Sequence, residues 1–159
     1  MVSILKSIRS IAKNRTTYRV GLLQAKAYRI LKQETTTILK PFGISTLDWA
    51  FLGLLADNGS LRSLRIAEEL GVEAPFITVM AHKLHKRGLV RVARGEKDRR
   101  VKTLALTEEG KRFIEDTEPL VREKIRPIID GIKASDIGAY LIALEGIVRN
   151  GKKARESAS

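Results

Sequence analysis

Four basic side chains lie within seven residues of one another, and they are Arg94, Lys97, Arg99 and Arg100. Guanidinium and ammonium groups bind phosphate oxygens, so a cluster of this kind suits a polyanionic partner. Residues 95–98 favour a turn, and the flanking segments 89–92 and 101–106 have the apolar or alternating pattern of strands. The sequence therefore predicts a β-hairpin with these cations at or beside its tip, placed to follow a phosphate backbone or to enter a minor groove.

The segment before this hairpin, residues 64–89, has the pattern of two short helices joined at a glycine. The apolar face of the first helix is expected to comprise Leu64, Ile66, Ala67 and Leu70. Gly71 then permits a left-handed turn, and Pro75 favours the first turn of a second helix. The buried stripe of that second helix is expected to comprise Phe76 or Ile77, Met80 and Leu84.

This arrangement is a helix-turn-helix, which on its own is about as often a helical hairpin in a core as a nucleic-acid-binding unit. A basic β-hairpin that starts directly after the second helix turns it into a winged helix. The combination in residues 45–107 favours contact with nucleic acid.

The net charge points the same way. The chain has 159 residues, a formal charge of +12 and a pI of about 10.2. Residues 61–106 hold eleven basic and five acidic residues, whereas residues 107–159 hold ten of each. The absence of cysteine excludes disulfides and thiol redox chemistry within this chain. No apolar run approaches the roughly eighteen residues of a membrane span, and the N-terminus lacks a signal-peptide core, so we expect a cytoplasmic protein with no membrane partner.

The remaining segments are predicted to be helical at both ends of the winged helix. Residues 1–15 form a basic N-terminal arm, which is expected to fray or to pack on a partner subunit rather than on a membrane surface. Residues 16–44 and 108–150 have amphipathic stripes that are best buried against a second copy of the chain, so we expect a homodimer. Residues 151–159 are expected to be a disordered tail.

Two helix starts and two interruptions are predicted within these segments. Ser45 is expected to cap a buried helix, with Asp48 three residues later as its capping-box partner. Thr107 is expected to cap the helix after the hairpin. Pro119 and Pro127 each remove a backbone hydrogen bond from that helix, so we expect kinks or a break there.

In the order of its elements and in its motifs, the chain resembles the MarR family of bacterial transcriptional regulators. The family pattern K-x-G-L, D-x-R and L-x-L-T-x-x-G is matched by residues 86–89, 98–100 and 104–110. The family's helix-turn-helix turn is matched by Ile66-Ala67 and Leu70-Gly71, and the resemblance covers roughly residues 17–150. It implies a mainly α fold with a small β-hairpin wing, in which N- and C-terminal dimerisation helices flank a winged helix-turn-helix.

The resemblance also implies a function, namely a homodimer that binds double-stranded DNA at a pseudo-palindromic operator and regulates transcription, most often as a repressor. The second helix would enter a major groove and each wing a neighbouring minor groove, with half-sites about 10 bp apart. Carried over by motif, Arg100 corresponds to the arginine that enters the minor groove, and Asp98 orients it. Lys97 and Arg99 would then contact phosphates.

Many members of the family respond to small aromatic ligands, which here implies a pocket near Tyr28, Phe42 and Trp49. The competing interpretation is that these three aromatic side chains fill the core.

The start of the second helix departs from the family, because Glu73-Ala74-Pro75-Phe76 stands where polar or basic residues are common. Phe76 is expected either to contact a thymine methyl group or to be buried. The remaining polar candidates for the groove face are Thr78, His82 and Lys83.

No catalytic constellation is recognisable, so we expect neither an enzyme nor a cofactor. His82 and His85 have a spacing that could suit a metal, but that helix offers no cysteine and no acidic third ligand. We therefore expect no metal site, with His82 on DNA and His85 on a solvated face. Two alternatives to a sequence-specific regulator stay open, and they are a non-specific architectural DNA-binding dimer and a winged helix used for protein–protein assembly.

Overall fold

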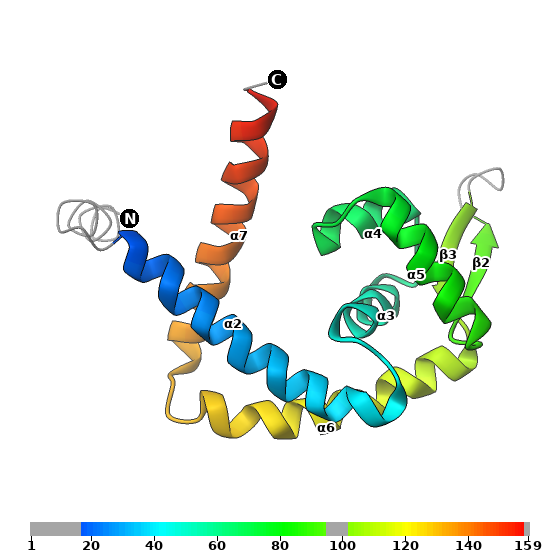
Figure 1. The fold of residues 1–159 in the computed structure, drawn as a ribbon, viewed down its shortest axis with the longest axis horizontal. Coiled ribbons are helices and arrows are strands. Elements are labelled where there is room, and N and C mark those ends of the chain that lie inside the picture. The colour runs from blue at the N-terminus through cyan, green and yellow to red at the C-terminus, as the bar shows by residue number, and fades with distance from the viewer. Residues whose placement is uncertain (1–16, 95–101, 158–159) are drawn as a thin grey trace. The chain divides into compact units, whose positions relative to one another are not determined.

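The computed structural model describes residues 17–94 and 102–157 of the chain (Figure 1). The chain divides into two compact units, Met1–Ile125 and Arg126–Ser159. The first unit contains, in chain order, α2 (Thr17–Leu39), the 3-10 helix η1 (Lys40–Phe42), α3 (Thr46–Asn58), β1 (Ser60–Leu61), α4 (Ser63–Leu70), α5 (Ala74–Lys86), β2 (Val90–Arg94), β3 (Lys102–Leu106) and most of α6 (Glu108–Ile129). The second contains the end of α6 and α7 (Ala134–Glu156).

The helix α3 is the centre of the first unit. The Ser45 hydroxyl accepts a hydrogen bond from the backbone N–H of Asp48 (3.1 Å), and the Asp48 carboxylate accepts one from the backbone N–H of Ser45 (3.0 Å). The predicted capping box is therefore confirmed. Beyond the cap the helix is apolar nearly all round, and Phe51, Leu52 and Leu55 are fully buried. A helix of this kind must be covered on every side, which draws the other elements around it.

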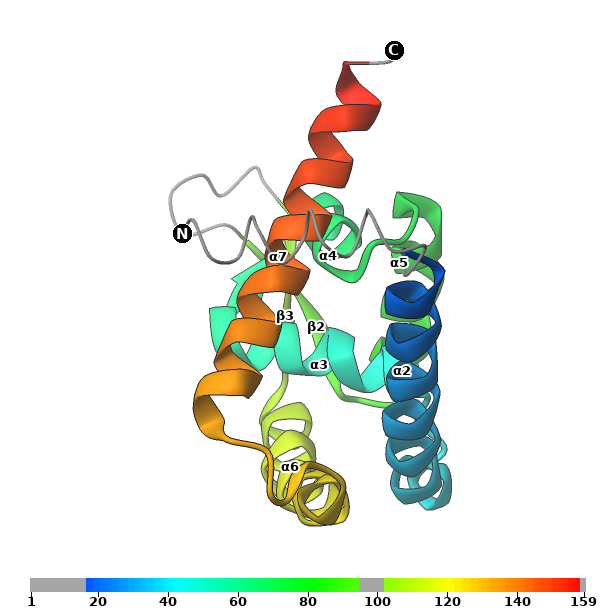
Figure 2. The same ribbon diagram turned by 90° about the vertical axis from the view of Figure 1, so that its left-hand side faces the viewer.

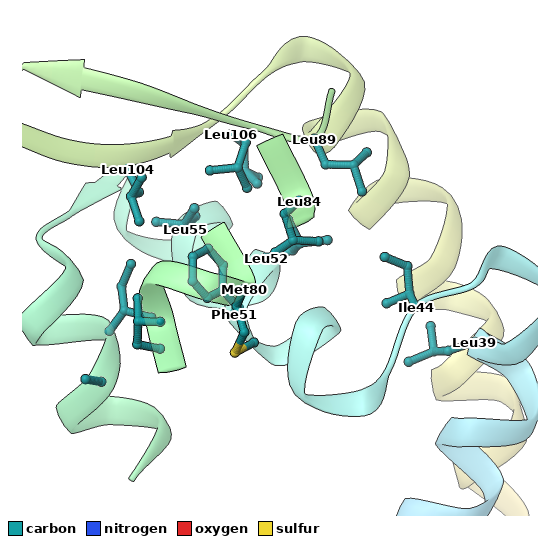
Figure 3. Close-up of a cluster of buried hydrophobic side chains, with 14 of the residues drawn as sticks. Leu39, Ile44, Phe51, Leu52, Leu55, Met80, Leu84, Leu89, Leu104 and Leu106 are labelled. Carbon is teal, nitrogen blue, oxygen red and sulfur yellow. The ribbon is translucent and has the colours of Figure 1, made fainter. Parts of the chain in front are cut away.

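The core of this unit combines side chains from distant parts of the chain (Figure 3). They come from the end of α2, the segment that follows it, α3, α4, α5, the strands and α6. The side chains labelled in Figure 3 are Leu39, Ile44, Phe51, Leu52, Leu55, Met80, Leu84, Leu89, Leu104 and Leu106. Burial of one such side chain stabilises the fold by about 1.5–3 kcal/mol. Because the core is shared, the helix-turn-helix and the sheet are both fixed to α3.

The sheet has three antiparallel strands in the order β1-β3-β2. The pairs between β2 and β3 run from Val90 with Leu106 to Arg94 with Lys102, so the predicted hairpin is confirmed. The strand β1 was not predicted, because two residues are too few to show an alternating pattern.

Long helices form the rest of the first unit. Figures 1 and 2 both show α2 as one uninterrupted helix. Glu34 of α2 forms an ion pair with Lys124 of α6 (3.3 Å), and the Trp49 indole of α3 donates a hydrogen bond to Thr117 of α6 (3.0 Å). The N-terminal half of α2 exposes several large apolar side chains, and they are Tyr18, Val20, Leu22, Leu23, Tyr28 and Ile30.

The helix α6 continues through both of its prolines, so of the predicted kinks or break, the break is wrong. Pro119 and Pro127 are exposed, where water can bind the carbonyl groups that lose their partners. On the opposite side Thr117 and Val121 are buried and hold the helix against the core.

In the second unit, α7 extends to Glu156, so residues 151–156 are helical rather than a disordered tail. Lys152, Lys153 and Arg155 favour this extension, because they are good helix formers and their charges are favourable at a helix C-terminus. Large apolar side chains along α7 are exposed, and they are Tyr140, Leu141, Ile142, Ile147 and Val148.

Within the described ranges, no single helix has both the length and the apolar character to cross a membrane. The segments Tyr18–Phe42 and Thr46–Asn58 pass that test only as a pair, by length and composition, and they are bent by 85° relative to each other.

Candidate nucleic-acid interface

The helices α4 and α5 meet at the predicted glycine turn. Gly71 has a φ of 66°, in the left-handed region, and its N–H bonds back to the last turn of α4. Val72 donates a further hydrogen bond to the carbonyl of Ala67 (3.0 Å). Pro75 lies in the first turn of α5, as predicted. The helix-turn-helix is therefore confirmed.

One side of α5 is buried, and it comprises Ile77, Met80 and Leu84. Phe76 is 48% exposed, so Ile77 and not Phe76 belongs to the buried stripe. Leu64, which was predicted to belong to the buried face of α4, is 63% exposed. The short length of α4 explains that error, because a helix of so few turns gives too little periodicity to locate a face.

Thr78 and His82 are exposed on α5, and both remain candidates for the groove. Val79 and Lys86 are also exposed there, and the sequence patterns did not single them out. Their spacing from Pro75 and His82 could have identified them, since residues three or four apart share a helical face.

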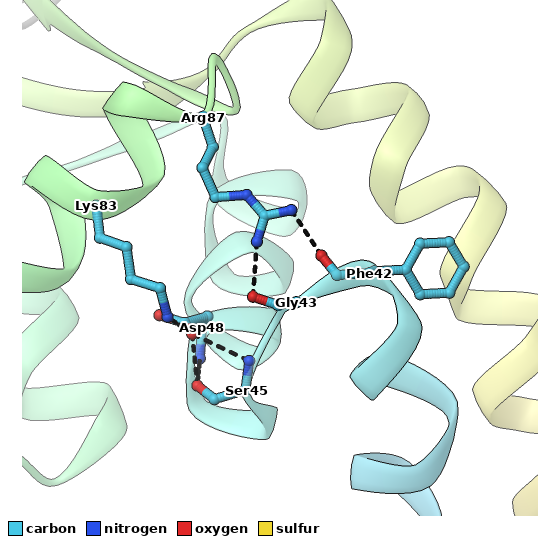
Figure 4. Close-up of polar contacts among 6 residues, drawn as sticks. All are labelled: Phe42, Gly43, Ser45, Asp48, Lys83 and Arg87. Carbon is cyan, nitrogen blue, oxygen red and sulfur yellow. Dashed lines mark hydrogen bonds and ion pairs between the residues drawn. The ribbon is translucent and has the colours of Figure 1, made fainter.

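Lys83 has a different environment from the one predicted. Its ammonium group donates a hydrogen bond to the carboxylate of Asp48 at 2.6 Å, which joins α5 to α3 (Figure 4). Burial of the Asp48 carboxyl raises its pKa, but the hydrogen bonds from Lys83 and Ser45 outweigh that effect and hold the pKa below its ordinary value. Lys83 therefore helps to position α5 on the core.

A second link holds the C-terminal end of α5. The Arg87 guanidinium donates hydrogen bonds to the backbone carbonyl oxygens of Phe42 (2.6 Å) and Gly43 (2.7 Å), as Figure 4 shows. These two residues lie in the segment between α2 and α3. The sequence did not predict this contact, because its acceptors are main-chain atoms that no side-chain pattern identifies.

The base of the hairpin is fastened to α5 and α6. The Nδ1 atom of His85 donates a hydrogen bond to the carbonyl of Val90 (2.9 Å), so His85 has a structural partner in addition to its solvated position. The Thr107 hydroxyl donates to the carbonyl of Gly88 (2.5 Å) and accepts a hydrogen bond from the N–H of Gly110 (2.9 Å). The predicted cap at Thr107 is confirmed, and it holds the hairpin at the same time.

Gly110 is needed for this junction. A Cβ atom at that position would overlap the backbone carbonyl of Leu89. The T-x-x-G spacing of Thr107 and Gly110 thus has a steric reason, since the chain leaving α5 passes directly beside the first turn of α6.

The strands of the hairpin carry Arg91 and Lys102, which are both exposed. The backbone of Arg94 ends β2, and its side chain is not among the described side chains. Four predicted contacts fall outside the described residues altogether, and they are Lys97, Asp98, Arg99 and Arg100.

The three aromatic residues predicted to line a pocket have different surroundings. Tyr28 is 61% exposed on α2, and the Trp49 indole is bonded to Thr117. Phe42 makes an edge-to-face contact with Phe113, with ring centroids 5.7 Å apart. These two rings border a cavity of about 420 Å³, whose other lining residues are Arg87, Leu89, Glu109, Arg112 and Asp116.

Among the described residues, no group of three or more His, Asp or Glu side chains is arranged to hold a metal ion.

Comparison with known proteins places this geometry in a family. The MarR family model matches residues 42–101. The chain is 31% identical over 105 residues to the HTH-type transcriptional regulator FarR of Neisseria gonorrhoeae, and this match covers 66% of the chain and 70% of FarR.

Two solved structures are similar over most of the chain. The transcriptional regulator PA3341 is 28% identical with a TM-score of 0.75, covering 84% of this chain and 98% of that one. NadR in complex with 4-hydroxyphenylacetate is 26% identical with a TM-score of 0.72, covering 83% of this chain and 92% of that one. With the motifs, the winged fold and these matches in agreement, the chain belongs to the MarR family of transcriptional regulators.

Proposed function

We propose that this protein is a homodimeric, sequence-specific DNA-binding repressor of transcription. The α5 helix of each subunit lies in a major groove, and the hairpin that follows lies in a neighbouring minor groove. One observation carries the proposal. The exposed side of α5 takes no part in the core, while Lys83, Arg87 and Thr107 fix the orientation of α5 and the base of the hairpin.

Charge supports DNA as the partner. Residues 61–106, which span α4, α5 and the hairpin, hold eleven basic and five acidic residues. In this proposal Thr78 and His82 face the bases, and Lys86 and Arg91 face phosphates. The residues of the hairpin tip act as the family resemblance implies, with Arg100 in the minor groove beside Asp98, and with Arg94, Lys97 and Arg99 on the backbone.

A homodimer accounts for the uncovered helices. The N-terminal half of α2 and the length of α7 expose large apolar side chains, and a second copy would bury both sets. A twofold dimer presents two copies of α5, so the operator should be an inverted repeat with half-sites about 10 bp apart.

A small aromatic carboxylate is the ligand that we propose for this protein. The cavity beside Phe42 and Phe113 has a size typical of ligand sites. Its lining combines the two aromatic rings with two arginines, Arg87 and Arg112, and with two acidic residues, Glu109 and Asp116. It adjoins the Arg87 contacts that hold the end of α5, so an occupant there is well placed to alter DNA binding. The similar protein NadR has been solved in complex with 4-hydroxyphenylacetate, which is an aromatic carboxylate of this kind.

The test of DNA recognition is selection of bound sequences from a random pool of duplexes at near-physiological salt. We expect an enriched inverted repeat. Binding without enrichment would support the architectural alternative, and absence of DNA binding would support protein–protein assembly. The Arg100→Ala variant should lose affinity strongly, whereas Arg122→Ala, which changes an ion-paired arginine on α6, should retain it.

The test of the ligand uses 4-hydroxyphenylacetate as the probe. We expect it to raise the Tm of the protein and to release selected DNA, and we expect Arg112→Ala to weaken both effects. The Arg122→Ala variant is again the matched control. An unchanged Tm at millimolar probe would exclude this class of ligand.

A further inference from the structure

The helix α5 presents apolar side chains on a side that the fold leaves uncovered. Val79 is 66% exposed and Phe76 is 48% exposed, and Pro75 beside them is exposed as well. These exposed side chains do not pack on the core, because Ile77 and Met80 are the residues of this part of α5 that are buried there. An exposed valine and phenylalanine in one turn indicate an apolar partner outside the described chain.

The positions of these side chains follow a line along the helix. Pro75, Val79, His82 and Lys86 recur every three or four residues, so they share the helical face opposite Ile77. The first half of this line is apolar, and its second half is polar and basic. Phe76 lies next to its apolar half.

Recognition helices contact base edges mainly through their N-terminal residues. In the major groove, the C5-methyl group of thymine is the largest apolar group that a base edge offers. An apolar N-terminal part of the helix therefore matches thymine, because the methyl group offers it the largest apolar contact.

Charge on the same surface argues against an apolar protein partner. Lys86 at the end of the line and Arg91 on the hairpin are exposed cations, and the region carries a marked excess of basic residues. A DNA duplex has both properties that this surface requires, because its phosphates are anionic and a thymine methyl group is apolar. An apolar surface of another protein would have only the second.

We propose that Val79, with Pro75 and Phe76 beside it, forms a receptor for thymine methyl groups, so that each half-site of the operator carries thymine beneath the first two turns of α5. This inference rests on the proposed function, since it names the base chemistry that the same interface selects. It also explains why the start of the helix lacks the polar residues that usually stand there in the family.

The test replaces thymine by deoxyuridine, which removes the methyl group and leaves every hydrogen-bonding group in place. In a selected inverted repeat, we expect one thymine position per half-site at which this change weakens binding by about three- to fivefold. Changing both half-sites together should weaken binding by about tenfold or more.

The Val79→Ala variant tests whether the Val79 side chain causes the sensitivity to deoxyuridine. It is a mild change for folding, because Val79 is exposed and alanine is the best helix former. We expect the variant to bind the thymine and deoxyuridine duplexes with affinities within twofold of each other. The matched control is Val92→Ala on β2, which removes a similarly exposed valine and should keep the full sensitivity to deoxyuridine.

The outcomes are separable from those of the proposed function. Specific binding that is indifferent to deoxyuridine at every thymine would overturn the methyl receptor and leave the regulator intact. Undiminished sensitivity in Val79→Ala would overturn the role of Val79. If the selection enriched no sequence at all, the proposed function itself would fail.

Discussion

Asp48 links two parts of the interface through one carboxylate. It accepts a hydrogen bond from the backbone N–H of Ser45 at the start of α3 and another from the ammonium group of Lys83 on α5. The carboxyl is almost fully buried, whereas the Lys83 side chain is about half exposed. The buried partner of such a pair has the greater effect on stability, because it has no water to replace a lost donor.

We therefore expect Asp48→Asn to lower the free energy of unfolding by about 1–3 kcal/mol. The amide can still accept from Ser45, but it loses the charge that binds Lys83. Urea unfolding followed by circular dichroism measures the change. Asp57→Asn, on the exposed end of the same helix, should stay within about 0.5 kcal/mol of the parent protein.

The same contact predicts a dependence on pH. Because the pKa of Asp48 is held below its ordinary value, its contribution is complete at neutral pH and is lost as the pH falls through the lowered pKa. The parent protein should thus lose stability below about pH 4 more steeply than Asp48→Asn. Parallel acid profiles for the two proteins would contradict this linkage.

At the scale of single residues, sequence patterns predicted the caps at Ser45 and Thr107 because both depend on local spacing. They did not predict that Lys83 pairs with a residue 35 positions away, or that Arg87 binds main-chain oxygens. Contacts of this kind depend on how helices pack, and one sequence carries no direct sign of them.

At the scale of elements, the junction of the hairpin with α6 depends on close approach. Thr107 bonds to Gly88, and Gly110 leaves room for the Leu89 carbonyl. The hairpin can approach a groove in a defined direction only if this base is rigid.

We expect Gly110→Ala to destabilise the protein by about 1–3 kcal/mol, because the new methyl group forces the backbone of Leu89 away. Thermal and urea unfolding both report the loss, and DNA binding should weaken with it. The control is Gly53→Ala on α3, where a Cβ atom meets nothing within 4 Å. There the same exchange should be neutral or should stabilise by up to about 1 kcal/mol.

The elements themselves were largely predictable. Strong helical periodicity and clear stops gave α2, α3 and α5, and the turn between two alternating runs gave the hairpin. The failures lie where local signals conflict with context. Pro119 and Pro127 suggested kinks or a break, but a long packed helix tolerates both prolines without breaking. The polar residues after Gly151 suggested disorder, although they favour a helix.

At the scale of the whole molecule, two sets of apolar side chains need a partner. One lies on the N-terminal half of α2 and the other on α7, with Ile142 at 71% exposure. Sedimentation equilibrium should give about twice the 17.7 kDa mass of one chain. Leu141→Asp should shift the protein toward monomer and weaken operator binding, whereas a monomeric parent protein would contradict the twofold arrangement.

The net charge of +12 predicts a strong dependence of DNA affinity on salt. If the dimer neutralises six or more phosphates, log K should fall with log salt with a slope of about −5 or steeper. Fluorescence anisotropy between about 50 and 200 mM salt measures it. Arg99→Ala, which removes a proposed phosphate contact, should reduce the slope by about one unit per subunit, and a slope near zero would exclude a phosphate-binding interface.

The Arg87 contacts have a consequence for how such a regulator can diversify. Its guanidinium binds the main-chain oxygens of Phe42 and Gly43, and every amino acid supplies the same oxygen. The Phe42 side chain points instead toward Phe113, at the cavity. If the cavity holds the proposed ligand, the side chain at position 42 can therefore be exchanged, and the range of bound ligands changed, while the connection through Arg87 to the end of α5 is inherited unaltered.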